Sequence, residues 1–353
     1  MDNASQIPGS GNGRKLPALW GWHSYLSILI TVAAFAVLAH YVDFERVWQE
    51  MAGSNKRLLL LAALAHYATY PVRGIRWKRC LNHLPVRCGY ARFGLLVFFY
   101  NFVDNLVPAK LGDLYASHLV RINCGVRRSA ALGSILFLRT LDAWILLCLA
   151  AATSWVLFAG TLPASVTWAL IGGCVLAVVA TAMMLIFIIF KRSLPAWFPE
   201  TVKQLISAFQ SAMWPKPKET VPVAALTLVI WALETLWIYL LVQGFGVRLN
   251  AAETVFVTMI PLIASAFPFT PSGAGVVELS LFSCLRLVGV ASPLAVSLTV
   301  VNRFIDYWLH ILLGTVTWLL RARLGMHSWR EVPLEDGSEP NMVGLPVGKE
   351  KAA

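Results

Sequence analysis

The sequence has few charged residues, and acidic ones are the scarcer: 18 Asp and Glu against 29 Lys and Arg among 353 residues. Charged residues make up 13% of the chain and hydrophobic residues 58%, which is more apolar surface than a soluble domain can bury. The six cysteines form no Cys-x-x-Cys pair, so the sequence predicts neither a disulfide framework nor a zinc site. There is no Gly-x-Ser-x-Gly, His-Glu-x-x-His or Asp-x-Asp motif and no nucleotide-binding loop. We therefore expect no enzyme activity, no metal and no cofactor.

The charge that is present has the sign and distribution of a membrane protein. A net charge of +11 would suit a nucleic-acid-binding protein, but the cations lie between hydrophobic runs, where anionic lipid headgroups attract them. We therefore expect membrane lipids, and no nucleic acid, as partners. With the N-terminus in the cytoplasm, most Lys and Arg residues fall in cytoplasmic loops, as the positive-inside rule requires. The C-terminus is then cytoplasmic as well.

Six apolar runs are long enough to span a bilayer, which takes about 20 helical residues. They are residues 24–42, 58–77, 129–158, 165–190, 222–243 and 293–320. Two further apolar regions, residues 91–123 and 253–289, break at Pro and Gly near the middle, and each arm is short for a span. Because unpaired backbone survives at membrane depth only inside protein or beside water, we predict two re-entrant hairpins. The predicted fold class is an all-α polytopic membrane protein.

The two halves of the chain repeat one plan. Each contains span, span, hairpin and span, and the last span of each carries Arg-x-x-Asp-x-Trp, at residues 139–144 and 303–308. The hairpins would enter from opposite faces, which predicts an inverted-topology repeat with a substrate site near the membrane midplane. The predicted units are a polar cytoplasmic tail (1–23), two membrane repeats (24–158 and 159–320) and a disordered cytoplasmic tail (321–353).

The repeated motif places charges within apolar segments, where each costs about 2.5–3.5 kcal/mol on insertion scales. Arg139 and Asp142 lie three residues apart, as do Arg303 and Asp306, so each pair shares a helix face. One hypothesis is that the pairs are structural and hold the spans together. The other is that the arginines bind a lipid phosphate while the aspartates hold them in place, because a guanidinium matches a phosphate with two hydrogen bonds.

The hairpin turns are the second candidate site. Gly273 and Gly275 permit close approach of the backbone, and the helix that follows could bind an anion at its N-terminus. Glu278 would suit the dipole of that helix without any ligand. Asp113 flanks the matching turn in the first half, either as part of a binding site or as a solvated turn residue.

Three more charged residues lie in or at the ends of spans. Arg73 and Arg76 share a face near the cytoplasmic end of the second span, where they either anchor the helix or receive headgroups. Glu234 lies in mid-span without a basic neighbour in sequence. It is either protonated or paired with Arg139 or Arg303 across the bundle.

An ordered set of motifs extends over nearly the whole chain. The motifs are Arg73-x-x-Arg76-Trp77, Asn101-x6-Pro108-x3-Gly112-Asp113, Leu138-Arg-Thr-Leu-Asp142, Pro268-x-x-Pro271-x-Gly273-x-Gly275-x-x-Glu278 and Arg303-x-x-x-Tyr307-Trp308. Together they resemble the flippase-like family, the transmembrane region of lysylphosphatidylglycerol synthases and their stand-alone relatives. The resemblance implies a bacterial inner-membrane protein that moves lipids or lipid-linked molecules between leaflets. Full-length synthases add a cytoplasmic aminoacyl-transfer domain, and the sequence ends at Ala353 without one, so synthase activity is not expected.

From these observations we expect a protein that flips an amphipathic lipid with an anionic or polar headgroup. Arg139 and Arg303 would bind the headgroup, and the hairpin turns would gate access from each side. Two alternatives remain open. One is a membrane-embedded transferase that acts on a lipid carrier, with Asp113 or Glu278 as general base. The other is a non-transporting partner of a lipid-modifying enzyme.

Overall fold

The computed structural model of the protein describes residues 44–106, 112–190, 200–266 and 273–326. Every regular element within these ranges is helical, which confirms the predicted all-α class. The elements are α2 (Phe44–Gly53), α3 (Lys56–Cys80), α4 (Tyr90–Leu106), α5 (Gly112–Cys124), α6 (Arg128–Phe158), α7 (Ala164–Phe190), α8 (Glu200–Ala212), α9 (Pro217–Gly244), α10 (Ala251–Ser265), α11 (Val276–Leu287), α12 (Ser292–Arg303), the π-helix η2 (Phe304–Trp308) and α13 (Leu309–Leu319). The predicted first span (24–42), the tail before it and residues 327–353 lie outside the described ranges.

Four of these helices are long and apolar enough to cross a membrane, namely α3, α6, α7 and α9, with 25, 31, 27 and 28 residues. They coincide with four of the six predicted spans. The predicted span over residues 293–320 corresponds to three consecutive segments, α12, η2 and α13, each of which is shorter than a membrane-spanning helix. The chain is therefore a multi-pass membrane protein.

Local sequence determines where several helices begin. The side chain of Asn55 accepts hydrogen bonds from the backbone N–H groups of Arg57 and Leu58 at the start of α3. Asn250 and Glu253 form a capping box at the start of α10, in which each side chain accepts from the other residue's N–H. α9 begins at Pro217, whose missing N–H would have no partner in the first turn of a helix.

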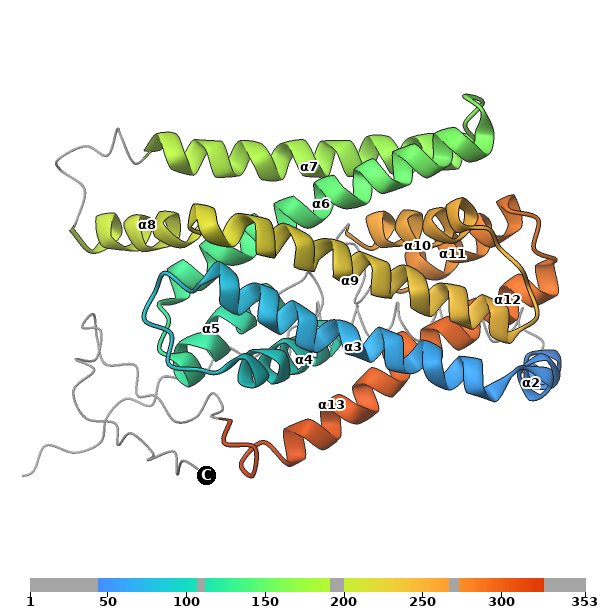
Figure 1. Ribbon diagram of the computed structural model, residues 1–353, viewed down its shortest axis with the longest axis horizontal. Helices are drawn as coiled ribbons and strands as arrows, with labels where there is room; N and C mark the ends of the chain where they lie inside the picture. Colours follow the sequence, from blue (N-terminus) through green and yellow to red (C-terminus); the bar gives the residue numbers. More distant parts are fainter. Residues whose placement is uncertain (1–43, 107–111, 191–199, 267–272, 327–353) are drawn as a thin grey trace, which may run out of the picture.

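Two pairs of shorter helices lie against the long ones. α4 packs on α5 and on α3, and α10 packs on α11 and on α6. Figure 1 shows the two pairs toward opposite ends of the bundle. The connections within the pairs, residues 107–111 and 267–272, lie outside the described residues, and so do Pro108, Lys110 and Pro268.

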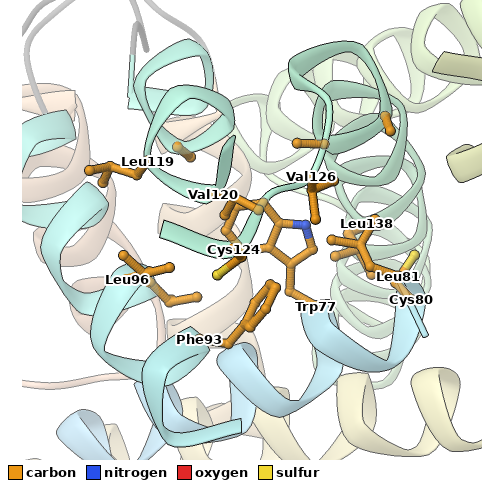
Figure 2. Packing of buried hydrophobic residues seen from close by; sticks show 14 of the residues in the cluster. Trp77, Cys80, Leu81, Phe93, Leu96, Leu119, Val120, Cys124, Val126 and Leu138 are labelled. Atoms are coloured by element: carbon orange, nitrogen blue, oxygen red, sulfur yellow. The ribbon is translucent and has the colours of Figure 1, made fainter. Parts of the chain in front are cut away.

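Buried apolar side chains form one core around the end of α3. Figure 2 shows Trp77 surrounded by residues of α4 and α5, and its ring meets that of Phe93 edge-on at 5.6 Å. Its indole N–H donates to the Oγ of Ser134 on α6 at 2.9 Å, so the one polar atom of the ring is satisfied in the interior. A second core involves α9, α10, α11 and α12, with Phe256 and Leu298 among its fully buried members.

The structure joins Cys88 and Cys124 in a disulfide, so the prediction of no disulfide is wrong for this pair. The two residues are 36 positions apart and their Cα atoms lie 5.1 Å from each other. They meet because α4 packs on α5, which places Cys88, two residues before α4, beside Cys124, the last residue of α5. Cysteine spacing alone contains no signal for such a contact.

Candidate functional site

A cavity of about 440 Å³ lies among helices of both halves of the chain. Its volume is within the range of pockets that hold small ligands. The acidic, basic and histidine residues of its lining are His66, Arg73, Asp104, Asp113, Arg139, Asp142, Glu234, Arg303 and Asp306. Most of the predicted site residues are thus brought together, although they are spread over more than 230 residues of sequence.

The arginine of each repeated motif pairs with a carboxylate that follows the hairpin turn of its own half. Arg139 on α6 donates to both carboxylate oxygens of Asp113, at 2.8 and 3.3 Å. In the second half, Nε of Arg303 lies 2.7 Å from Oε1 of Glu278. Asp113 and Glu278 both lie in the first turn of their helices, α5 and α11. The two halves therefore repeat a contact between side chains as well as a sequence motif.

The two equivalent pairs differ in accessibility. The side chains of Arg303 and Glu278 are 6% and 9% exposed, whereas those of Arg139 and Asp113 are 42% and 27% exposed. Arg139 is therefore accessible to a ligand in the cavity. Arg303 cannot leave Glu278 without stranding a buried carboxylate.

Asp142 does not hold Arg139, although the two share a helix face as predicted. Asp142 accepts two hydrogen bonds from Arg76 on α3, at 2.5 and 3.0 Å, and Arg76 also donates to Oγ1 of Thr227 at 3.1 Å. Arg76 is 5% exposed and does not line the cavity. In this structure the guanidinium of Arg76 is bonded to Asp142 inside the bundle, so it is neither an exposed anchor nor part of the cavity lining.

Glu234 on α9 pairs with Arg73. The sequence predicts a protonated Glu234 or a pair with Arg139 or Arg303, and neither of these pairs is present among the described residues. Nη2 of Arg73 donates to Oε1 of Glu234 at 2.8 Å, and the indole N–H of Trp237 donates to Oε2 at 3.0 Å. Nδ1 of His66 lies 3.8 Å from the same Oε2. Arg73 also lies over the ring of Trp231, 5.5 Å from its centroid. These contacts join α3 to α9.

Asp306 lies in the π-helix η2, which interrupts the otherwise α-helical run of the last predicted span. Its Oδ2 is 3.9 Å from Nη1 of Arg303, and its Oδ1 is 3.5 Å from Nε2 of His66. The hydroxyl of Tyr67 donates to the carbonyl of Ile305 at 3.1 Å. π-helical segments occur frequently at functional sites, because the wider turn redirects side chains and leaves carbonyls to other partners.

Gly273 and Gly275 both have a positive φ, a backbone conformation that glycine adopts without strain. Gly275 has φ +84° and precedes α11, and its N–H donates to Oε2 of Glu278 at 2.7 Å. Gly273, with φ +67°, lines the cavity. In the first half Gly112 approaches Asp104 so closely that a Cβ would collide with it, and its N–H donates to Oδ1 of Asp104 at 3.1 Å. Carboxylates thus satisfy the N–H groups at both helix starts.

Sequence reasoning missed His66, Trp237 and Thr227 as neighbours of the charges. His66 precedes Arg73 by seven residues, two turns of one helix, so both lie on the same face of α3. That spacing was the available signal for His66. Nothing in the sequence indicates that Thr227 lies beside Arg76, because that contact depends on how α9 packs on α3.

The family model of the lysylphosphatidylglycerol synthase TM region matches residues 24–314 of the chain. The chain belongs to this family. The match confirms the resemblance seen in the motifs, and it includes every residue discussed in the cavity. Membership of the lysylphosphatidylglycerol synthase TM family identifies the chain as a membrane protein.

The chain is also similar to several archaeal proteins. A UPF0104 membrane protein of Pyrococcus horikoshii is 23% identical over 332 residues, which cover 85% of this chain and 98% of the relative. Another UPF0104 membrane protein, from Methanocaldococcus jannaschii, is 23% identical over 63% of this chain and 95% of its own length. A glycosyltransferase, AglD of Haloferax volcanii, is 28% identical over 116 residues, which cover 33% of this chain and 18% of that protein.

Proposed function

We propose that this protein moves an amphipathic lipid or lipid-linked molecule, with a polar or anionic headgroup, between the leaflets of a membrane. The observation that carries the proposal is the charged cavity among apolar helices, built by both halves of the chain. Moving a polar headgroup through hydrocarbon unaided costs several kcal/mol or more, because its water is lost without replacement. A cavity lined with charged and amide side chains lowers that cost by supplying new partners.

The arrangement of the ion pairs supports transport rather than a purely structural role. Arg139 is accessible from the cavity and donates to Asp113, which is partly exposed, whereas the pair of Arg76 and Asp142 is buried. A structural role needs only the buried pair. An accessible guanidinium can exchange its carboxylate for a phosphate oxygen, and it keeps two parallel hydrogen bonds when it does so.

The proposal includes a topology of six spans and two opposed re-entrant hairpins. Support comes from the opposed placement of the pair α4 and α5 against the pair α10 and α11 (Figure 1). Basic residues gather at the end of the bundle where α3 ends and α6 begins, with Lys78 and Arg79 in α3 and Arg127 before α6. We assign that end to the cytoplasm, together with both termini, in a cell membrane. Such a repeat presents similar sites to either face, as a carrier requires.

The alternative is a membrane-embedded transferase that acts on a lipid carrier. The similarity to a glycosyltransferase over 116 residues favours it, and Asp113 or Glu278 would be the general base. Both carboxylates are engaged with arginines, so each would have to leave its arginine before it could take a proton from a substrate. A third possibility is that the protein recruits a lipid-modifying enzyme through its basic end without transporting lipid.

The test uses the purified full-length chain in liposomes that contain a small fraction of phosphatidylglycerol with a fluorescent headgroup label. A membrane-impermeant reductant quenches label in the outer leaflet, so continued quenching measures leaflet exchange. We expect exchange at a rate well above that of protein-free liposomes, with the mass of the lipid unchanged. A covalently modified lipid that disappears with Asp113→Asn or Glu278→Gln would overturn the proposal in favour of the transferase.

Matched variants separate the cavity from the surrounding protein. Arg139→Leu removes the accessible guanidinium of the cavity and should abolish exchange. Arg79→Leu removes a guanidinium that pairs with Glu219 outside the cavity, at 3.3 Å, and should leave exchange intact. Equal rates in the two variants would show that the cavity does not carry the lipid.

A further inference from the structure

His66 lies between two carboxylates that belong to different halves of the chain. Its Nδ1 is 3.8 Å from Oε2 of Glu234 on α9, and its Nε2 is 3.5 Å from Oδ1 of Asp306 on η2. The residue is 4% exposed and lines the cavity. Neither ring nitrogen makes a hydrogen bond with the part of the chain that the structure describes. The ring is therefore held in place by the two acids and by the aromatic side chains around it.

The geometry identifies the protonation state that fits this position. A neutral imidazole has one N–H donor and one nitrogen that can only accept a hydrogen bond. That second nitrogen would face a carboxylate oxygen, which is also an acceptor, and the two would repel each other. The imidazolium form has a donor on each nitrogen and can attract both acids. At 3.5 and 3.8 Å the contacts are longer than hydrogen bonds, so charge attraction orients the ring.

The balance of charge around His66 also requires a proton. The groups connected to it through ion pairs are Arg73, Arg303, Glu234, Glu278 and Asp306. Among the residues that the structure describes, these three carboxylates face two guanidiniums, an excess of one negative charge in a largely buried cluster. A buried charge without a partner is costly, and a proton on His66 cancels it.

Other groups facing the ring do not supply that charge. On α3, Tyr67 and Tyr70 meet it edge-on at 5.2 and 5.8 Å between centroids, and Arg73 is already committed to Glu234. On α9, the ring of Trp237 lies 5.1 Å away. His310 of α13 stacks on Tyr70 at 4.9 Å, so it is a neighbour of the cluster, but a second positive charge there would repel that of His66.

We propose that His66 is a proton-binding site that couples a proton to each lipid carried by the cavity. The proposal rests on the proposed function. The proton enters through the cavity, binds the ring of His66, and leaves from the same nitrogen to water on the other side of the membrane. Loss of the proton removes the attraction between His66 on α3 and Asp306 on η2. The contact between these two helices then weakens, which allows the cavity to open toward the other side of the membrane. An anionic headgroup and one proton cross together with no net charge.

The experiment uses the same liposomes with labelled phosphatidylglycerol, a pH gradient of about one unit, and K⁺ with valinomycin to hold the membrane potential at zero. One proton per lipid shifts the steady-state ratio of labelled lipid between leaflets by about tenfold per pH unit. We expect this shift in the wild type. It should vanish in His66→Gln, which cannot be protonated, and in His66→Lys, which keeps the charge. His83→Gln, in which the altered histidine lies outside the cavity, should retain it.

The outcomes separate the two proposals. Exchange that proceeds in the wild type without any response to the pH gradient overturns proton coupling and leaves lipid transport standing. A sodium gradient that reproduces the shift at uniform pH shows that the bound ion is a metal cation instead. If the wild type exchanges no lipid, ¹⁵N NMR of the histidine side chains in lipid discs decides the proton site by itself. A signal that is absent from His66→Gln and keeps both protons at pH 7 supports the site, and a neutral ring there overturns it.

Discussion

Arg76→Leu should destabilise the protein more than loss of any arginine at its surface. Arg76 and Asp142 are 6% and 9% exposed in their side chains and share two hydrogen bonds. Removal of one partner from such a buried pair typically costs about 3–5 kcal/mol, because the other charge is left without compensation. Oγ1 of Thr227 loses a donor at 3.1 Å as well, although it keeps its own hydrogen bond to the carbonyl of Val223.

The cost should come from the stranded charge rather than from the lost attraction. A double variant, Arg76→Leu with Asp142→Leu, removes both charges and should recover most of the stability, since apolar pairs of similar volume often replace buried ion pairs without loss. The control is Arg79→Leu. Arg79 is 38% exposed and pairs with Glu219, so its loss should cost only about 0–1 kcal/mol.

The assay is reversible unfolding by sodium dodecyl sulfate in mixed micelles, followed by circular dichroism, which yields a free energy of unfolding for each variant. A loss of less than about 1 kcal/mol in the free energy of unfolding for Arg76→Leu would refute the reasoning, because a buried carboxylate without a partner costs more than that. A double variant as unstable as the single one would refute it equally. In that case the pair would stabilise the fold by its attraction.

Three further predictions concern the site and the topology. Arg303→Lys should lose most lipid exchange in liposomes, because an ammonium cannot replace the planar guanidinium that faces Glu278; full activity would show that any cation suffices. In a cysteine-free background, Lys110→Cys should be labelled by a membrane-impermeant maleimide from the cytoplasm and Ser272→Cys from the outside; labelling of both from one side would contradict the opposed hairpins. Alkylation in intact cells should trap Cys88 and Cys124 as thiols, because a cytoplasmic location keeps cysteines reduced, and the disulfide that the structure shows should form only after lysis in air. A disulfide already present in cells would place that end outside.

The sequence was sufficient for those features that depend on the period of a helix or the length of an apolar run. The spans that became α3, α6, α7 and α9 needed only hydrophobicity and length. The face shared by Arg139 and Asp142 needed only helical spacing. The pairing of the charged side chains could not be predicted in this way. Asp142 pairs with Arg76 because α3 packs beside α6. That packing is a tertiary contact, and no local sequence pattern predicts it.

The same limit explains the errors at Glu234 and at the cysteines. The two arginines considered for Glu234 were those of the repeated motif, whereas its partner, Arg73, lies on the neighbouring helix α3. Cys88 and Cys124 meet because a helix pair folds back, and nothing in their spacing depends on that fold. By contrast, the positions of Asp113 and Glu278 just after the two turns were visible in the sequence, and both are in contact with the motif arginines.

α7 is the least enclosed of the four long helices, since only 17% of its apolar window is buried against the rest of the protein. Val175, Val178 and Met183 are among its exposed side chains, at 56%, 50% and 45%. In a bilayer these side chains meet acyl chains, which are fluid and adjust to any shape. These side chains then need only be apolar, and substitutions among Val, Ile, Leu and Met should leave the stability of the protein unchanged there. Natural variants of this protein should therefore drift fastest in size, and least in polarity, along this one helix.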